Sequence, residues 1–265
     1  MHTLRVFCSF VKYRFLAQIE YPGSYVLGII AQWAVYGASV FMIYLMINSF
    51  GALGGWLPVE VIFLYAVWLM TYALGAAFVF NICTRFSQMS VEGALDEAYV
   101  RPLSPFAYLI STNFNLGYIS HVILTAGLLA FSIIQLELSW SFFLWLWFVV
   151  VLLSGAVITA CLMLICYMPA FRTRSRSPFE MFFSEGRYFN QYPLTIYPRP
   201  LQMIFTSILP FGFVSFYPIQ VLLGKQDGIL PYITVWLAPL VAVTLAVAAM
   251  LCWRVISRGY ESAGT

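Results

Sequence analysis

Six long apolar segments constrain this chain more than any other feature of its sequence. A helix needs roughly 20 apolar residues to cross the hydrocarbon core of a bilayer, and each segment meets that length. Helices satisfy their backbone groups internally, whereas the strands of a membrane barrel alternate in polarity over ~10 residues, and these segments do not. The sequence therefore predicts six transmembrane helices. The segments cover residues 24–47, 60–83, 107–134, 140–167, 200–223 and 231–253.

The composition supports a membrane protein and excludes several soluble classes. Charged residues make up 9% of the 265 residues, and apolar residues make up 62%. A soluble domain carries about 25% charged residues, so this chain cannot cover a water-facing surface. An ordinary soluble enzyme, a nucleic-acid-binding module and a disordered protein are therefore excluded. We predict an all-α, polytopic membrane protein with short loops and no large soluble domain.

The chain is expected to divide into three parts. Residues 1–23 predict an amphipathic helix lying in the headgroup region, because apolar residues recur there at helical spacing and basic residues lie away from them. The alternative is a basic leader without regular structure. Residues 24–255 form the six-helix transmembrane domain, and residues 256–265 form a cytoplasmic tail. The apolar positions of the first helix are Leu4, Phe7, Val11 and Phe15.

The lysines and arginines predict the orientation of the chain. With six spans, twelve of the thirteen fall on one side of the membrane, and only Lys225 falls on the other. Cytoplasmic loops are enriched in Lys and Arg, so that side and both termini are expected to be cytoplasmic. The twelve are Arg5, Lys12, Arg14, Arg85, Arg101, Arg172, Arg174, Arg176, Arg187, Arg199, Arg254 and Arg258.

The sequence lacks the motifs typical of ATP hydrolysis and of common catalytic sites. Lys12 and Lys225 are the only lysines, and neither follows the glycine-rich loop of a phosphate-binding motif. The five cysteines and two histidines show no metal-ligand spacing, so no catalytic, cofactor-binding or metal-binding residue is expected. The span interiors also lack the carboxylates that ion-coupled carriers place there. Energy for transport is therefore expected to come from another protein.

Polar residues and prolines mark two spans as unusual. Asn113, Asn115 and His121 fall within the third segment, with His121 expected half-way along it. Polar residues at membrane depth are candidates for a transport pathway, and a hydrogen bond to a neighbouring helix is the structural alternative. In the fifth segment, Pro210 and Pro218 remove backbone donors, which predicts a broken or partly re-entrant helix.

The loop between the second and third segments contains the clearest candidate contact surface. Residues 90–100 predict a short helix with Ser90 as its N-cap and Glu92 in its first turn. Arg101 would lie at its C-terminal end, and Pro102 would stop it. A short charged helix held at the membrane suits a cytoplasmic partner. The alternative is a solvated connector that reverses the chain.

Several motifs share their order and spacing with a known family. The loop reads Gly93-Ala-Leu95-Asp96 and then Arg101-Pro102-Leu-Ser-Pro105, and the region of the fifth segment reads Tyr197-Pro198, Pro210-Phe211 and Tyr217-Pro218. With these motifs, an interfacial helix, six spans and no ATPase motif, the chain resembles permease subunits of ABC-2 type export transporters. Within that family, the chain is similar to a bacterial six-span branch of about this length.

The resemblance implies a half-transporter in the bacterial cytoplasmic (inner) membrane. Two permease chains, identical or related, would form the membrane unit, and a dimer of a separate ATPase would bind ATP and magnesium. The helix at residues 90–100 would be the coupling helix that docks into the ATPase. The candidate docking residues are Glu92, Gly93, Leu95, Asp96, Glu97, Arg101 and Pro102.

The resemblance and the aromatic content indicate small substrates. Aromatic residues make up 18% of the chain, and a route lined by their rings suits hydrophobic or amphipathic compounds, including cations held on ring faces. Relatives of this branch are associated with export of organic cations. Two alternatives stay open: an integral membrane enzyme that modifies lipids with Glu180, Glu185 and Arg187, and a membrane assembly subunit that transports nothing.

Overall fold

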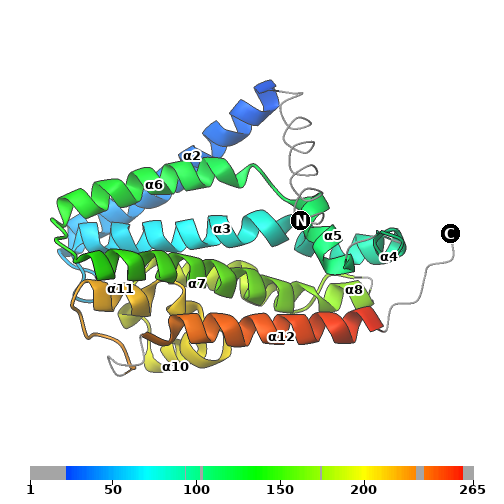
Figure 1. Ribbon diagram of the computed structural model, residues 1–265. Helices are drawn as coiled ribbons and strands as arrows, with labels where there is room; N and C mark the ends of the chain where they lie inside the picture. The colour runs from blue at the N-terminus through cyan, green and yellow to red at the C-terminus, as the bar shows by residue number, and fades with distance from the viewer. Residues whose placement is uncertain (1–21, 93, 102–103, 174, 231–235, 259–265) are drawn as a thin grey trace.

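The protein is a bundle of long helices packed side by side (Figure 1). The computed structural model describes residues 22–92, 94–101, 104–173, 175–230 and 236–258. Within them, all named elements are helical, and five helices are long and apolar enough to cross a membrane. A bent pair of shorter helices is a sixth candidate. These findings confirm the prediction of an all-α polytopic membrane protein. The predicted interfacial helix and most of the tail lie outside the described residues.

Long helices alternate with short ones along the chain. The long helices are α2 (Pro22–Phe50), α3 (Pro58–Val91), α6 (Tyr118–Gln135), α7 (Phe142–Tyr167) and α12 (Ala238–Arg258). Short helices lie between α3 and α6, namely α4 (Ala94–Tyr99) and α5 (Pro105–Asn113). The remainder are α8 (Pro169–Thr173), α9 (Glu180–Gly186), η1 (Arg187–Gln191), η2 (Leu194–Ile196), α10 (Arg199–Met203), η3 (Ile204–Ile208), η4 (Phe211–Phe213) and α11 (Phe216–Leu222).

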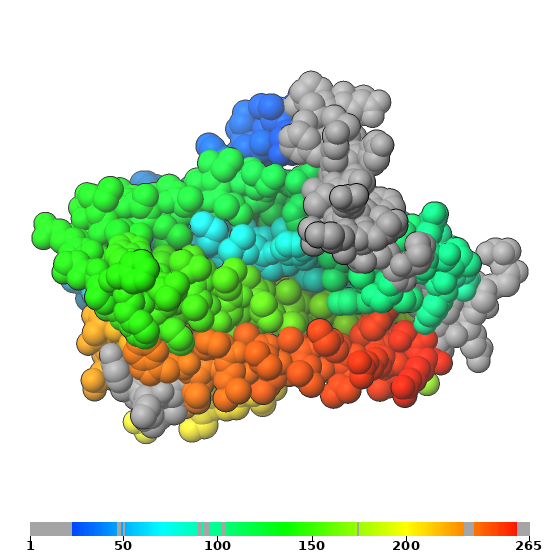
Figure 2. All heavy atoms as spheres, viewed as in Figure 1, coloured from blue at the N-terminus to red at the C-terminus, as the bar shows by residue number. Residues whose placement is uncertain are grey.

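Helix α3 is the centre of the bundle. Between Val61 and Ala77 its side chains are almost all apolar and nearly all are buried, which is expected of a helix surrounded by other helices. On the face shown in Figure 2, only a narrow strip of α3 is visible between α6 and α7. The ring of Phe63 stacks on Phe148 of α7 with centroids 5.8 Å apart. Helices α6 and α7 pack directly on α3, and α12 packs on α7.

Helices α3 and α7 approach each other closely because glycines face the contact. A Cβ atom on Gly75 would lie 2.5 Å from the carbonyl oxygen of Ala156, and one on Gly155 would lie 2.6 Å from the Thr71 side chain. Small residues let helix backbones approach in membranes, where dispersion contacts replace the hydrophobic effect as the source of stability. These two glycines were not predicted as packing positions.

Helix α12 covers the opposite side of α7, as its small residues allow. Ala238 and Ala242 are buried, and Trp147 of α7 meets Trp236 just before α12 with ring centroids 4.7 Å apart. Ala246, the next residue at this four-residue spacing, is half-buried. The stripe of small residues therefore serves helix packing within the chain.

The bundle has two distinct ends. The turn end carries the loops between α2 and α3 and between α6 and α7, at the left of Figure 1. The arginine end carries α4, α5, α8 and the end of α12, at the right. Six of the nine described lysines and arginines belong to the arginine end. They are Arg85, Arg101, Arg172, Arg176, Arg254 and Arg258.

The chain returns from the arginine end to the turn end through residues 177–197, which we call the crossing segment. At its start, the Ser177 hydroxyl donates to the carbonyl oxygen of Cys166, at the end of α7 (2.6 Å). At its finish, the Thr195 hydroxyl donates to the carbonyl oxygen of Gly54, in the loop before α3 (3.3 Å). The crossing segment thus takes the place expected of a fifth span, although it is built from short helices.

This path corrects the predicted placement of two arginines. Arg187 and Arg199 were expected to lie with the other arginines in one cytoplasmic loop. Arg187 instead lies part-way along the crossing segment, and Arg199 follows it at the turn end. The prediction failed because the crossing segment contains charged residues and was therefore assumed to be part of a loop.

The region predicted as the fifth span, residues 200–223, forms a bent pair instead of a straight helix. Its two halves, Arg199–Ile208 and Phe211–Leu222, meet at 77°. Both halves are anchored at the turn end, since Thr195 contacts Gly54 just before the pair and Trp140 donates to the carbonyl oxygen of Leu222 at its end (3.2 Å). The pair is therefore a re-entrant hairpin. Pro210 stands at the break, and Pro218 lies in the first turn of α11.

An ion pair fixes this hairpin to the start of α3. Lys225 Nζ lies 2.9 Å from Glu60 Oε2 and donates to the carbonyl oxygen of Gly55 at 3.0 Å. The same Glu60 oxygen accepts a hydrogen bond from the Leu57 amide, so it also caps α3. The ammonium lies 5.2 Å from the centre of the Trp56 ring. The few charges of the turn end thus join the loop after α11 to the loop before α3 and to the first turn of α3.

The third predicted span is interrupted. Residues 107–134 were expected to form one helix, but α5 ends at Asn113 and α6 begins at Tyr118. Polar side chains near the break supply partners for the backbone groups that an interrupted helix leaves unpaired. Only α6 runs along the bundle.

Gly75→Ala should destabilise the protein by about 1–3 kcal/mol, because the added methyl group would enter the backbone of α7. Thermal unfolding of the detergent-solubilised chain measures the change. Gly127→Ala in α6 is the matched control, since a Cβ atom there meets nothing within 4 Å. Because alanine has a higher helix propensity than glycine, Gly127→Ala should keep or raise the thermal unfolding midpoint. Equal midpoints for the two variants would contradict the close approach of α3 and α7.

Candidate functional site

The first candidate site is the charged segment at the arginine end, residues 85–108. Helix α3 continues to Val91, and a separate short helix, α4, covers only Ala94–Tyr99. The prediction of one helix over 90–100 with Ser90 as its N-cap is therefore wrong. Ser90 lies in the last turn of α3 because buried residues such as Phe86 and Met89 hold that helix together by packing.

Ion pairs and a hydrogen bond join the parts of the charged segment. Arg85 pairs with Glu92 at 3.3 Å, and Arg101 pairs with Glu97 at 3.1 Å. The Tyr108 hydroxyl donates to Glu97 at 2.7 Å, and the Arg101 guanidinium lies 5.8 Å from the centre of the Tyr108 ring. The Tyr108 hydroxyl and the Arg101 guanidinium lower the pKa of the Glu97 carboxyl. Glu97 thus connects α4 to α5.

Three of the predicted docking residues are exposed on this segment, namely Glu92, Glu97 and Arg101, and Asp96 is half-buried. Gly93 and Pro102 lie outside the described residues, as does the side chain of Leu95. Two exposed apolar side chains were not predicted, Tyr99 and Val100, which are 54% and 80% exposed. Their position directly before Arg101, at the end of a short charged helix, was the signal that could have identified them.

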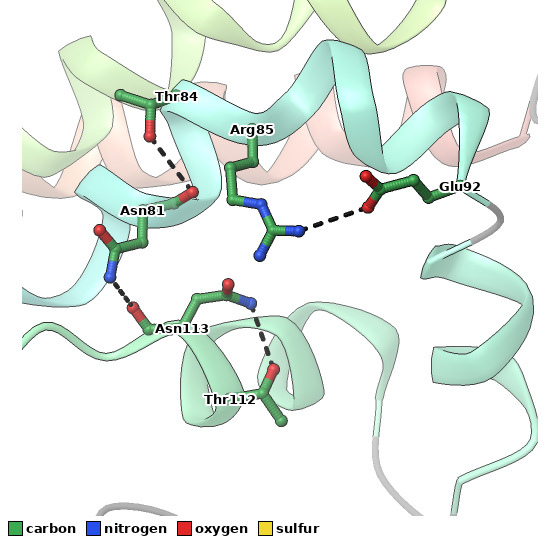
Figure 3. Close-up of polar contacts among 6 residues, drawn as sticks. All are labelled: Asn81, Thr84, Arg85, Glu92, Thr112 and Asn113. Carbon is green, nitrogen blue, oxygen red and sulfur yellow. Dashed lines mark hydrogen bonds and ion pairs between the residues drawn. The ribbon is translucent and has the colours of Figure 1, made fainter. Parts of the chain in front are cut away.

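An asparagine junction joins α3 to the end of α5 and to the start of α6, and Figure 3 shows its contact between Asn81 and Asn113. Asn81 of α3 donates to the carbonyl oxygen of Asn113 at 3.0 Å, and Asn115 donates to the Asn81 side chain at 3.2 Å. The Asn115 amide also donates to the carbonyl oxygen of Ala77 at 2.9 Å. The Asn115 side chain then accepts the Gly117 amide. The break between α5 and α6 is therefore bound to α3 through both side chains and backbone.

His121 lies in the first turn of α6, close to this junction. It was expected half-way along the third span, and the break before α6 explains the difference. Its Nε2 lies 3.0 Å from the Tyr36 hydroxyl of α2, and its ring centre lies 4.9 Å from that of Tyr118. His121 thus makes a hydrogen bond to a neighbouring helix, which was the structural alternative to a place in a transport pathway.

A second candidate site surrounds Arg187 inside the bundle. Its guanidinium lies 4.3 Å from the centre of the Tyr72 ring and 4.5 Å from that of Tyr188. Tyr72 in turn meets Tyr118, with ring centroids 5.9 Å apart. The residues around Arg187 come from α2, α3, α6 and the crossing segment. We call them the Arg187 cluster, which consists of Tyr36, Tyr72, Tyr118, His121, Arg187 and Tyr188.

Comparison with known proteins places this architecture in a family. A family model described as ABC-2 family transporter protein matches residues 33–264. The chain belongs to the ABC-2 transporter family. A search of curated proteins and a search of solved structures each find no significant match.

ABC-2 membrane proteins generally work with an ATPase partner, so the family indicates a transport subunit in place of an enzyme. The three residues named for the alternative lipid-modifying enzyme are not joined to one another by ion pairs. Arg187 bonds to the Ser184 carbonyl oxygen and to Tyr188, and no ion pair joins it to Glu180 or Glu185. Within the described part of the chain, no group of three His, Cys, Asp or Glu residues could hold a metal ion.

Glu97 should make the contact between α4 and α5 sensitive to acid. Because its pKa is lowered in the folded protein, its stabilising effect is present above the ordinary carboxyl pKa of about 4.3 and is lost as the pH falls through the lowered pKa. Unfolding midpoints of the native protein and Glu97→Gln should therefore differ at neutral pH and converge in acid. Tyr108→Phe removes the main cause of the lowered pKa and should narrow the difference.

Glu137→Gln, at the exposed turn between α6 and α7, is the control for this experiment. It should show no such convergence, because Glu137 forms no ion pair with another described residue. A constant difference between the native protein and Glu97→Gln over the whole pH range would contradict the assigned role of Glu97.

Proposed function

We propose that this ABC-2 protein is the permease subunit of an ATP-driven exporter and that its charged segment docks on a cytoplasmic ATPase. The observation that carries the proposal is the direct connection between the exposed charged segment and the start of α6. Glu97 and Tyr108 join α4 to α5, and Asn81 and Asn113 join the end of α5 to α3. A force applied to α4 therefore reaches the membrane-spanning helices through polar contacts instead of a flexible loop.

The exposed surface of the charged segment suits such a docking role. Val100 and Tyr99 provide an apolar centre, and Glu92, Glu97 and Arg101 surround it with charges of both signs. Interfaces commonly combine an apolar centre with a polar rim. ATP and magnesium would bind to the ATPase, and this chain would contribute no catalytic group.

The membrane unit of the exporter would contain two permease chains, either two copies of this protein or one copy with a related chain. We place the protein in the bacterial cytoplasmic membrane with the arginine end inside, since that end carries most of the arginines. The aromatic residues of the bundle support a small hydrophobic or amphipathic substrate.

Docking is tested by purifying the protein together with a candidate ABC ATPase partner. Val100→Asp should weaken the complex by about tenfold or more, because it places a charge at the apolar centre of the contact. Arg101→Gln should weaken it less. Glu137→Gln, at the opposite end of the bundle, is the control and should leave the affinity unchanged. Unchanged affinity for Val100→Asp and Arg101→Gln would show that this segment is not the docking surface.

Asn81→Ala should separate docking from transport. The variant removes the hydrogen bond to Asn113 and the acceptor for Asn115 but leaves the exposed surface of α4 unchanged. We expect normal binding of the ATPase, and a several-fold loss of ATP-driven efflux from reconstituted vesicles. Thr84→Ala is the matched control, since the Thr84 hydroxyl bonds only to carbonyl oxygens within α3. If both variants transport equally well, the asparagine junction does not transmit the motion.

A further inference from the structure

Arg187 is a cation inside the bundle, and its surroundings indicate a ligand of opposite charge. We propose that the Arg187 cluster binds the anionic head of an amphipathic ligand, a carboxylate or a phosphate on an apolar body. The identification of this ligand as cargo depends on the proposed function, whereas the binding site itself does not.

The position of Arg187 follows from its partners. Its side chain lies against Tyr72, near the middle of the central helix α3, and the neighbouring Tyr188 packs on Trp68 with ring centroids 6.3 Å apart. The side chain is half-buried within the single chain. Ionisable residues at such positions in membrane proteins face the protein interior and commonly mark a substrate pathway.

The charge of Arg187 is not balanced by a carboxylate. The ion pairs among the described residues are Arg85–Glu92, Arg101–Glu97 and Lys225–Glu60, none of which includes Arg187. Glu185, the acidic residue nearest in sequence, is exposed. The side chain is half-buried, and its cation–π contacts with Tyr72 and Tyr188 leave its charge without a counter-ion. A bound anion would supply that counter-ion.

The donors of Arg187 suit a planar or tetrahedral anion. Nε donates to the carbonyl oxygen of Ser184 at 3.3 Å, and Nη2 donates to the Tyr188 hydroxyl at 2.7 Å. These bonds leave the Nη1 protons and the second Nη2 proton without a protein acceptor among the described residues. A guanidinium presents such protons as a fork that matches carboxylate and phosphate oxygens.

The rest of the cluster suits the body of an amphipathic molecule. Tyr72, Tyr118 and His121 are buried and form the base of the cluster, whereas Tyr188 and the neighbouring Phe189 are 45% and 38% exposed and offer apolar contact area beside Arg187. A cationic substrate would instead face the like charge of Arg187. The ligand expected at this cluster is therefore anionic, in contrast to the organic cations associated with relatives of this branch.

Equilibrium binding to the full chain in phosphatidylcholine nanodiscs tests the proposal. The probes are radiolabelled laurate and dodecyl phosphate, with dodecyltrimethylammonium as a competitor of equal chain length, and empty nanodiscs correct for partition into lipid. The native protein should bind both anions, and the ammonium compound should compete poorly. Stronger binding of the ammonium compound than of either anion would overturn the proposal. This comparison requires no variant, so it stands even where a variant does not fold.

Variants then assign the binding to Arg187. Arg187→Gln should weaken anion binding by about tenfold or more, the effect of losing hydrogen bonds from a charged group. Arg187→Lys should restore part of the affinity, because it keeps the charge but loses the fork, whereas a purely structural role would not produce this order. Arg176→Gln, an exposed cation at the arginine end, is the control and should bind as the native protein does. Unchanged anion binding in Arg187→Gln would overturn the proposal.

Two further measurements ask whether the bound anion is a bilayer lipid or a single-chain molecule, and whether anion binding and ATP-driven transport occur independently. If phosphatidylglycerol in the nanodiscs displaces laurate, the site takes a bilayer lipid, and if it does not, the site takes a single-chain anion; both results support an anion site. Anion binding without ATP-driven transport would refute the proposed function and keep the site. Transport that continues while no anion binds would refute the site and keep the proposed function.

Discussion

The burial of α3 is the constraint on which the rest of the structure depends. A membrane offers little hydrophobic force between helices, so close packing and satisfied polar groups must hold the bundle together. Gly75 and Gly155 allow α3 and α7 to approach, and α6 and α12 are built outward from that pair. Because α3 is held along its whole length, groups attached to it at different depths keep fixed positions relative to one another.

Three functional regions are attached to α3 in this way. The Lys225–Glu60 ion pair holds the re-entrant hairpin at its start, Tyr72 carries the Arg187 cluster near its middle, and Asn81 carries the asparagine junction near its end. The helix is longer than the thickness of a bilayer, so its final turns extend to the charged segment. One rigid element thus connects the proposed ATPase contact to the proposed ligand site.

The sequence predicted the membrane class, the all-α fold and a break near Pro210, because apolar length and missing backbone donors are local properties. It did not predict the crossing segment, since Glu180, Glu185 and Arg187 interrupt its apolar character and make it resemble a loop. The frequent aromatic residues between Phe179 and Tyr192 were the available signal. The interruption at Asn113 was also missed, because hydropathy does not distinguish a broken apolar run from a continuous one.

The candidate sites differ in how far they could be predicted. The charged segment was found because its motif is continuous in sequence, although packing of Phe86 and Met89 extended α3 through the expected cap. The Arg187 cluster was not found, since α2, α3, α6 and the crossing segment each contribute to it. Only the folded chain shows that an arginine assigned to a loop lies among tyrosines of three other helices.

Helix α2 has a mechanical property that follows from its sparse attachment. Ile43 packs into the core near the turn end, while the opposite end of the helix diverges from the bundle (Figure 1). Between them, contacts from Gln32, Trp33 and Tyr36 reach Ser120 and His121 of α6. Lipid tails can replace its remaining apolar contacts at little cost, so a pivot about Ile43 would break only a few hydrogen bonds. That pivot would open the tyrosine-lined interior sideways to the bilayer, giving a membrane-dissolved molecule a way in without passing through water.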